Sequence, residues 1–206
     1  MPTTQYSSIV PITSSDIDFD EFEPTFPPHQ DLPFLEWEKR LLDLSSSETT
    51  IRRAELTGAD GRRMKDLQTV CVPITVRSVR MNVGTIADET VLIAEIDSIH
   101  VGYCIVTPGR GPVSPLFIKV VAVAPAAQRR GVGLALLLAA STLAPRRDIA
   151  LATQDDNLAA RSMNDKFASA IGASIRRVKL DTYRNTDLGI RRGMGYRAWL
   201  IERPVE

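Results

Sequence analysis

The segment Gln128-Arg-Arg-Gly-Val-Gly133 carries residue types that suit a phosphate-binding loop. It follows the β-branched run Val121–Val123 and precedes the apolar run Leu134–Ala140. The first amides of a helix have no partner within that helix, and the helix dipole adds partial positive charge there. Glycine lets a phosphate approach this backbone without a side chain in the way. The spacing therefore predicts a strand, an anion-binding loop and a helix, and with them a cofactor that carries phosphate.

Two other phosphate-binding loops do not fit these residues. The nucleotide P-loop requires Gly-x4-Gly-Lys-Ser/Thr, and the chain contains no such segment. A dinucleotide loop requires a third glycine and follows the first strand, whereas Gly131 and Gly133 come late in the chain and lack that third glycine. A glycine-rich helix start that serves packing alone remains an alternative.

The loop resembles the acyl-coenzyme A loop of the Gcn5-related N-acetyltransferase (GNAT) superfamily. That family's pattern is Gln/Arg-x-x-Gly-x-Gly/Ala after a strand that ends in Val-x-Pro, and Val123-Ala-Pro125 precedes the loop here. Val91–Val106 resembles the family's second and third strands, and Ile9–Asp16 its first strand and helix cap. Asn157–Ser162 resembles the start of its fourth helix.

The resemblance implies an α/β (α+β) fold, in which a central mixed, mostly antiparallel sheet is flanked by helices. It implies acetyl-CoA as co-substrate, an amine as acceptor and no metal. It also implies ten cofactor-binding residues: Val121, Ala122 and Val123 for the pantetheine arm, Gln128, Arg129, Arg130, Gly131, Val132 and Gly133 for the pyrophosphate, and Asn157 for the end of the pantetheine. For each arginine a solvated loop charge is an equal alternative, and for Asn157 the alternative is a plain helix cap.

The catalytic residues of the family have no counterpart in this chain. The position of the family's proton-donating tyrosine falls on Asn164, and that of the glutamate base on Phe117. We expect Glu95, Lys119, His29 and His100 to face solvent, and Tyr183 and Tyr196 to serve packing. Ser162, in the same predicted helix as Asn157, would reach the thiol of the coenzyme only if the helix is oriented for it. Cys104 is not supported as a nucleophile by any neighbouring residue pattern. The catalytic residues therefore stay unassigned.

Two functions follow from this pattern. The first is an acyl-CoA-dependent N-acyltransferase in which the amine attacks directly within a ternary complex. The alternative is a GNAT-fold module that binds coenzyme A or a protein partner with little catalysis. The missing tyrosine and Phe117 favour the alternative, as does an atypical insertion at about residues 48–90, whereas the intact loop favours the enzyme.

Composition narrows the possible partners and the compartment. The net charge is zero, which argues against a nucleic-acid-binding protein. An acidic run, Asp16 to Glu23, suits attraction of a cationic amine, with a solvated helix face as the alternative. The two cysteines indicate reduced thiols, and neither a signal peptide nor a membrane span is visible, so we expect a cytoplasmic protein. A homodimer is left open.

The elements that must position the loop are predicted from periodicity and from turn residues. The 206 residues fit one domain, 1–206. We expect strands at 6–12, 69–79, 91–97, 100–107, 116–123, 149–153, 175–183 and 195–202. We expect helices at 32–44, 131–143 and 157–170, and an interrupted helix at 48–68.

Overall fold

A computed structural model of the chain describes residues 31–46, 48–111, 113–190 and 193–204. The expected strand at 6–12, its helix cap at Thr13–Asp16, the acidic run and His29 lie outside the described residues.

The described part of the chain forms one seven-stranded sheet with the order β1-β2-β3-β4-β5-β7-β6. Every neighbouring pair is antiparallel except β4 and β5, which are parallel. The expected fold, a mostly antiparallel sheet flanked by helices, is therefore confirmed. The strands are β1 Thr50–Arg53, β2 Thr90–Ile96, β3 Ile99–Pro108, β4 Leu116–Val123, β5 Ile149–Gln154, β6 Ser174–Val178 and β7 Tyr196–Glu202. The helices are α1 Leu32–Leu42, α2 Gly58–Val70, α3 Val79–Asp88, α4 Val132–Thr142, α5 Leu158–Ala170 and α6 Asn185–Leu188.

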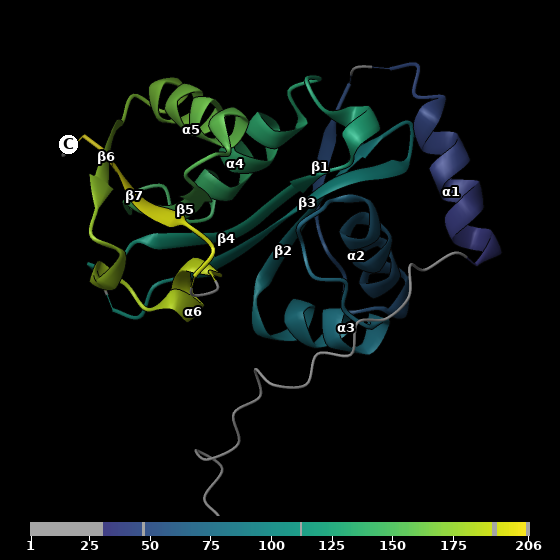
Figure 1. Ribbon diagram of the computed structural model, residues 1–206, viewed down its shortest axis with the longest axis horizontal. Coiled ribbons are helices and arrows are strands. Elements are labelled where there is room, and N and C mark those ends of the chain that lie inside the picture. Colours follow the sequence, from purple (N-terminus) through teal and green to yellow (C-terminus); the bar gives the residue numbers. More distant parts are fainter. Residues whose placement is uncertain (1–30, 47, 112, 191–192, 205–206) are drawn as a thin grey trace, which may run out of the picture.

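The helices cover the sheet on both faces, as Figure 1 shows. On one face lie α4 and α5, and on the other lie α2, α3 and α6. Contact between α4 and the sheet is close: a Cβ added to Gly102 of β3 would lie 3.3 Å from a Leu136 methyl group. On the opposite face Met64 and Leu67 of α2 are fully buried. Burial of these apolar side chains on both faces holds the layers together.

The β2–β3 hairpin confirms the expected pair of strands. Its two-residue turn is Asp97-Ser98, one residue earlier than expected, and both residues have positive φ, 51° and 61°. Such a turn matches the twist of two antiparallel strands, and aspartate tolerates this conformation better than most residues do. The hairpin places β3 beside β4, the strand that leads into the phosphate-binding loop.

The segment at 48–90 differs from the sequence-based expectation. Residues 50–53 form β1, which pairs with β2 along its length, and residues 58–70 form an unbroken helix. Gly61 does not interrupt α2 but lies where this helix packs against α3. A Cβ at this position would lie 2.7 Å from Val83, so a larger residue would prevent the two helices from packing so closely. The expected strand at 69–79 is wrong, since Thr69 and Val70 complete α2 and the next residues form a loop. These residues are integral to the sheet and its cover.

The last two strands are shorter than their pattern predicts. β6 ends at Val178, and Leu180–Thr182 form one turn of 3-10 helix in place of further strand. The polar link that follows contains the short helix α6, which ends at Gly189 with φ +66°. α6 lies over β4 and β5 on the face opposite α4. It covers a small second core formed by Phe117, Ala150, Leu188, Ile190, Ala198 and Leu200.

Candidate functional site

The sheet opens between its two parallel strands. β4 and β5 pair only from Leu116 with Ile149 to Ile118 with Leu151. Beyond that point Val120–Val123 has strand partners only on β3, and Ala152–Gln154 has them only on β7. The opening therefore begins after Ile118 and Leu151, which form its apex, and widens toward the phosphate-binding loop.

A β-bulge marks the apex. Ile105 of β3 pairs with Val120, and Val106 pairs with Ile118, so Lys119 is an extra residue without a partner on β3. A bulge bends its strand and raises the local twist. It thus directs the rest of β4 away from β5 at the residue where their pairing stops.

The helix that follows the opening begins without a side-chain cap. Its N-cap is Gly131, with φ +83°, which has no side chain to accept a hydrogen bond from the first-turn amides. A Cβ on Gly131 would meet nothing within 4 Å, so space above this helix end is open. The starts of α1, α2, α3 and α5 are capped by the side chains of Asp31, Thr57, Ser78 and Asn157. The start of α4 therefore keeps amides available for an anion.

Two side chains of the loop are engaged within the protein. Gln128 Nε2 donates to the Val123 carbonyl at 3.3 Å. Arg130 donates from Nη1 to the Ser46 carbonyl at 3.0 Å and from Nη2 to the Leu44 carbonyl at 3.3 Å. These bonds fix the loop to the link between α1 and β1, while Arg130 itself stays exposed. This anchoring was not among the expected roles for Arg130, which were a solvated charge or a phosphate contact.

The same link is held from the hairpin turn. Asp97 Oδ2 accepts from the backbone N–H of Ser46 at 3.1 Å and from Ser45 Oγ at 3.2 Å. The link therefore lies between two anchors, Asp97 on the β2–β3 turn and Arg130 in the loop.

α5 follows β5, the strand on the other side of the opening, and packs against α4. Asn157 caps α5, with Oδ1 accepting from the Ala160 N–H at 3.0 Å. Met163 touches the start of α4, because its sulfur lies 2.5 Å from where a Gly133 Cβ would be. Ser162 is exposed, whereas Asn164 is 3% exposed and its Nδ2 has no hydrogen-bond partner among the described residues.

Lys119 is bonded rather than free in solvent as expected. Its Nζ donates to Glu89 Oε1 at 2.9 Å, and Thr107 Oγ1 donates to Glu89 Oε2 at 2.9 Å. Both charged side chains are about 20% exposed. Glu89, which sequence analysis missed, thus ties the bulge to β3 and to the end of α3. No spacing signal pointed to it, because the contact depends on how strands pair.

Gly189 brings α6 onto the bulge. A Cβ at this position would lie 2.7 Å from the Lys119 carbonyl oxygen, which is backbone and has little freedom to move. The positive φ adds strain for any L-residue.

Gly189→Ala is therefore expected to lower the free energy of unfolding by about 1–3 kcal/mol. Chemical denaturation measures the change. Gly193→Ala is the matched control, because Gly193 also has positive φ, +80°, but open space around it. A loss no greater than that of the control would show that the close approach to Lys119 has no energetic weight.

The tyrosines on the α6 side serve packing, in line with expectation. The ring of Tyr183 meets Phe117 edge to face at a centroid distance of 5.3 Å, and burial raises the pKa of Tyr183. Tyr196 packs against the second core and lines two adjoining pockets of about 410 and 200 Å³ under the β6–β7 connection. Leu180 and Arg197 line both pockets as well.

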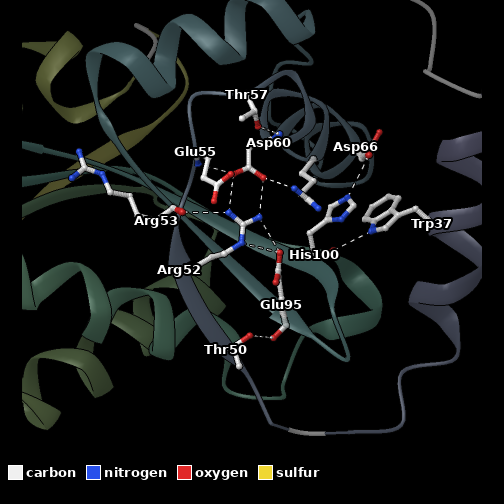
Figure 2. Close-up of polar contacts among 11 residues, drawn as sticks. Trp37, Thr50, Arg52, Arg53, Glu55, Thr57, Asp60, Asp66, Glu95 and His100 are labelled. Carbon is white, nitrogen blue, oxygen red and sulfur yellow. Dashed lines mark hydrogen bonds and ion pairs between the residues drawn. The ribbon is translucent and has the colours of Figure 1, made fainter.

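Glu95 belongs to a partly buried ion network around the buried Asp60 instead of facing solvent (Figure 2). Arg52 lies at its centre and donates to Glu95 Oε1 at 3.0 Å and to both oxygens of Asp60 at 2.7 and 2.8 Å. Asp60, 1% exposed, also accepts from Arg63 and from the Glu55 N–H. Burial by itself would raise the pKa of Asp60, but these hydrogen bonds outweigh it and hold the pKa well below 3.8.

His100 is likewise buried, against expectation. Its side chain is 11% exposed, and its ring stacks on Trp37 of α1 with centroids 4.7 Å apart. Trp37 Nε1 donates to the His100 carbonyl at 3.0 Å, and Asp66 Oδ2 lies 3.4 Å from His100 Nε2. Burial lowers the pKa of His100, with Asp66 opposing that shift. His100 thus docks α1 on the sheet (Figure 2).

The remaining sequence candidates carry little chemistry. Cys71 and Cys104 are buried free thiols, and burial raises the pKa of both. No group of three His, Cys, Asp or Glu side chains in the described residues is arranged to hold a metal ion. No helix in the described ranges is long and apolar enough to cross a membrane.

The sequence contained a signal for the start of α2 but none for β1. Thr57-Gly-Ala-Asp60 has the spacing of a helix start with a hydroxyl cap, and Thr57 Oγ1 does accept from the Asp60 N–H at 3.3 Å. The short apolar and basic run Thr50–Arg53 before it gives no comparable signal for a strand.

Comparison with known proteins shows which family has this sequence pattern and this fold. The sequence profile of the acetyltransferase (GNAT) family matches residues 64–168, just over half of the chain. The match begins inside the segment expected to be an insertion. No curated protein sequence matches significantly.

Several solved structures share the fold. A diaminobutyrate acetyltransferase (EctA) from Paenibacillus lautus, in complex with L-2,4-diaminobutyric acid and coenzyme A, has 20% identity and a TM-score of 0.62. It covers 78% of this chain and 100% of its own. Arabidopsis thaliana Naa50, bound to the bisubstrate analogue CoA-Ac-MVNAL, has 18% identity and a TM-score of 0.53 over 76% and 99% of the two chains. A Bacillus subtilis acetyltransferase in complex with CoA has 19% identity and a TM-score of 0.53 over 77% and 100%. With the profile match and this fold, the chain belongs to the acetyltransferase (GNAT) family.

Proposed function

We propose that the protein is an N-acyltransferase that transfers an acetyl group from acetyl-CoA to an amine. The observation that carries the proposal is the opening between β4 and β5, which leads to the uncapped start of α4 at Gly131. The family supports an acetyl donor, and the three structures compared above hold CoA or a CoA conjugate.

The pyrophosphate of the coenzyme would bind the loop at Gln128–Gly133 through the amides of residues 129–133, because the Gln128 N–H already donates to the Pro125 carbonyl at 3.2 Å. Gly131 turns the chain so that these amides face outward, and the helix dipole favours the negative charge. Arg129 and Arg130 add positive potential near the site, and Arg130 does so while bonded to the link.

The pantetheine arm would lie in the opening. Val121, Ala122 and Val123 lack a partner on the β5 side, so their backbone can bind an extended arm as a further strand. The Val123 carbonyl already accepts from Gln128, which leaves fewer free acceptors at that end. Asn157 would donate from Nδ2, because its Oδ1 serves the helix cap.

In the reaction, the acceptor nitrogen attacks the thioester carbon, the C–N bond forms and the C–S bond breaks. The electron pair of that bond stays on sulfur, and the proton lost by the amine neutralises the thiolate through solvent. An amide of β4 near Val123 would stabilise the oxyanion that forms between these steps. The neutral amine form is required, since an ammonium has no lone pair to attack with.

Two measurements on the full chain test the proposal. Acetyl-CoA is expected to raise the Tm, because a ligand that binds the folded state alone stabilises it by mass action. Free coenzyme A should then appear in the presence of some member of a panel of small amines and peptides. Stabilisation without release on any acceptor would support the binding-module alternative. No stabilisation would refute both.

Arg130 offers a test of how the loop is positioned. Arg130→Ala is expected to weaken acetyl-CoA binding about three- to tenfold, since a lost charge-assisted hydrogen bond is worth about 1 kcal/mol or more. Asp97→Asn loosens the same link from its other end and should weaken binding to a similar extent. Isothermal titration of both single variants and the double variant measures the coupling. Additive losses would mean that Arg130 contacts phosphate directly.

A further inference from the structure

The sheet opens a second time, between β7 and the edge strand β6 (Figure 1). The pairing of these two strands ends with Val178 opposite Ala198. Beyond that pair β6 ends, while the first two residues of β7 keep strand partners only on β5. The pocket of about 410 Å³ lies in this second gap, because its lining residues, 177–180 and 196–198, stand on either side of the last pair.

The lining of this pocket carries positive charge. Arg177, Lys179 and Arg197 line it. Among the described residues, neither an aspartate nor a glutamate lines this pocket or the adjoining one of about 200 Å³. Arg197 forms an ion pair with Asp155, whereas the side chains of Arg177 and Lys179 have no ion pair or hydrogen bond with any described residue. Cations gathered in a concave site attract an anion.

Other cations of the same segment are paired, and they lie outside the pockets. Arg176 donates to both carboxylate oxygens of Glu202 at 2.9 Å. Arg184 donates in the same way to Asp187. Neither arginine lines a pocket. Between residues 174 and 190 the paired cations thus lie outside the pockets and the free ones line them.

The two gaps begin at the same level of the sheet. Ala198, where the second gap starts, pairs with Ala152, the first β5 residue beyond the apex at Leu151. Both gaps widen toward the end where Gln154 pairs with Tyr196. Only β5 and β7 lie between the gaps, and neighbouring strands are about 4.8 Å apart, so the middles of the gaps are about 10 Å apart at this level.

We propose that the pocket between β6 and β7 binds a carboxylate of the acceptor, while the amine of the same molecule lies at the apex of the opening. The proposal rests on the acyltransferase function proposed above. Arg177 and Lys179 would donate charge-assisted hydrogen bonds to this carboxylate. A span of about 10 Å is the length of about three extended residues, so the reacting amine is not the α-amine of a free amino acid.

Matched pairs of amines test the site on the full chain. A series of ω-amino acids, from ω-aminobutyrate to ω-aminooctanoate, is compared with the methyl esters, and release of coenzyme A from acetyl-CoA is measured. At the preferred chain length the free carboxylate should have a KM about tenfold lower than that of its ester. The two kcat values should be similar, because a charge far from the reacting atoms binds substrate and transition state alike.

Two variants test the residues that would hold the carboxylate. Arg177→Gln and Lys179→Gln should each raise the KM of the preferred ω-amino acid about three- to tenfold and leave that of its ester unchanged. Arg176→Gln is the matched control, because it removes a cation from the same strand outside the pockets. It should leave both KM values unchanged. All three side chains are exposed, so the folded state should persist.

The outcomes separate this proposal from the function on which it rests. If the protein acetylates amines but the free carboxylate gives no lower KM than its ester at any chain length, the carboxylate site is refuted and the function stands. Equal losses in Lys179→Gln and Arg176→Gln also refute the site, because the effect would then come from the overall charge of this edge. If the wild-type protein releases no coenzyme A with any amine, both proposals fail.

Discussion

Gly131→Glu is expected to lower the affinity for acetyl-CoA by more than about a hundredfold. The new carboxylate would stand at the start of α4, where the pyrophosphate is proposed to bind. Two like charges about 4 Å apart repel by about 4 kcal/mol at an effective dielectric constant of 20. The folded state should persist, because nothing lies within 4 Å of a Cβ at this position. Isothermal titration with acetyl-CoA measures the loss.

Backbone strain is separated from charge by two alanine variants. Gly131→Ala introduces strain of about 1–2 kcal/mol at φ +83° without adding charge, so its affinity should fall less than that of Gly131→Glu. Gly172→Ala carries the same kind of strain at φ +65°, in open space after α5. Its Tm should fall while its affinity stays that of the wild type. Wild-type affinity in Gly131→Glu would mean that the phosphates bind elsewhere.

Asp60→Ala is expected to have the largest effect on stability, a loss of about 3–5 kcal/mol in the free energy of unfolding. The change leaves Arg52 without its bidentate partner and the Glu55 N–H without an acceptor. Urea denaturation measures the loss. The control is Glu202→Ala, which removes a carboxylate that also accepts two bonds from one arginine, Arg176, at the surface. Little change is expected there, because solvent screens exposed pairs. Equal effects in the two variants would contradict the role given to burial.

The same carboxylate predicts how stability depends on pH. The folded-state pKa of Asp60 lies well below 3.8, so its contribution is present in full above that value. The contribution is lost as the pH falls from about 4 toward the folded-state pKa. The free energy of unfolding of the wild type should therefore fall more steeply below pH 4 than that of Asp60→Asn. Parallel curves for the two proteins would show that the carboxylate is not held ionised.

Local patterns were sufficient for the part of the fold around the loop. The continuous apolar run Leu116–Val123 is a strand with the bounds expected, and α4 and α5 begin next to Gly131 and at Asn157 as their residues indicate. In these elements the apolar period, the glycine and the cap all favour the same local structure, so little depends on distant contacts.

Tertiary packing decided the segments where sequence reasoning failed. Propensity alone predicts that Gly61 breaks the helix, yet the close approach of Val79 and Val83 requires a glycine there. Thr69 and Val70 have strand-like side chains, yet they end α2. Propensity differences of a few tenths of a kcal/mol per residue are small beside the burial of a helix face, so the packing prevails.

Polar contacts between distant segments were also beyond sequence reasoning. His100 and Glu95 look like exposed hairpin residues, because nothing in the local sequence shows that α1 and α2 cover that end of the sheet. The bonds of Arg130 to the carbonyls of Leu44 and Ser46 could not be predicted either, because these partners lie more than eighty residues earlier in the chain. Such contacts depend on chain topology and leave no periodic trace.

The bulge in β4 changes the direction of the strand without changing which faces its side chains occupy. Ile118 pairs with Val106, and Val120 pairs with Ile105. Because Val106 and Ile105 are adjacent in β3, Ile118 and Val120 face opposite sides of the sheet, as two adjacent residues of a regular strand do. Removal of Lys119 would thus keep each remaining side chain on its present face. It would remove the bend, and with it the reason for β4 to leave β5, together with the ion pair to Glu89. Lys119 is in this sense a spacer: the strand needs it for its direction, not for its alignment.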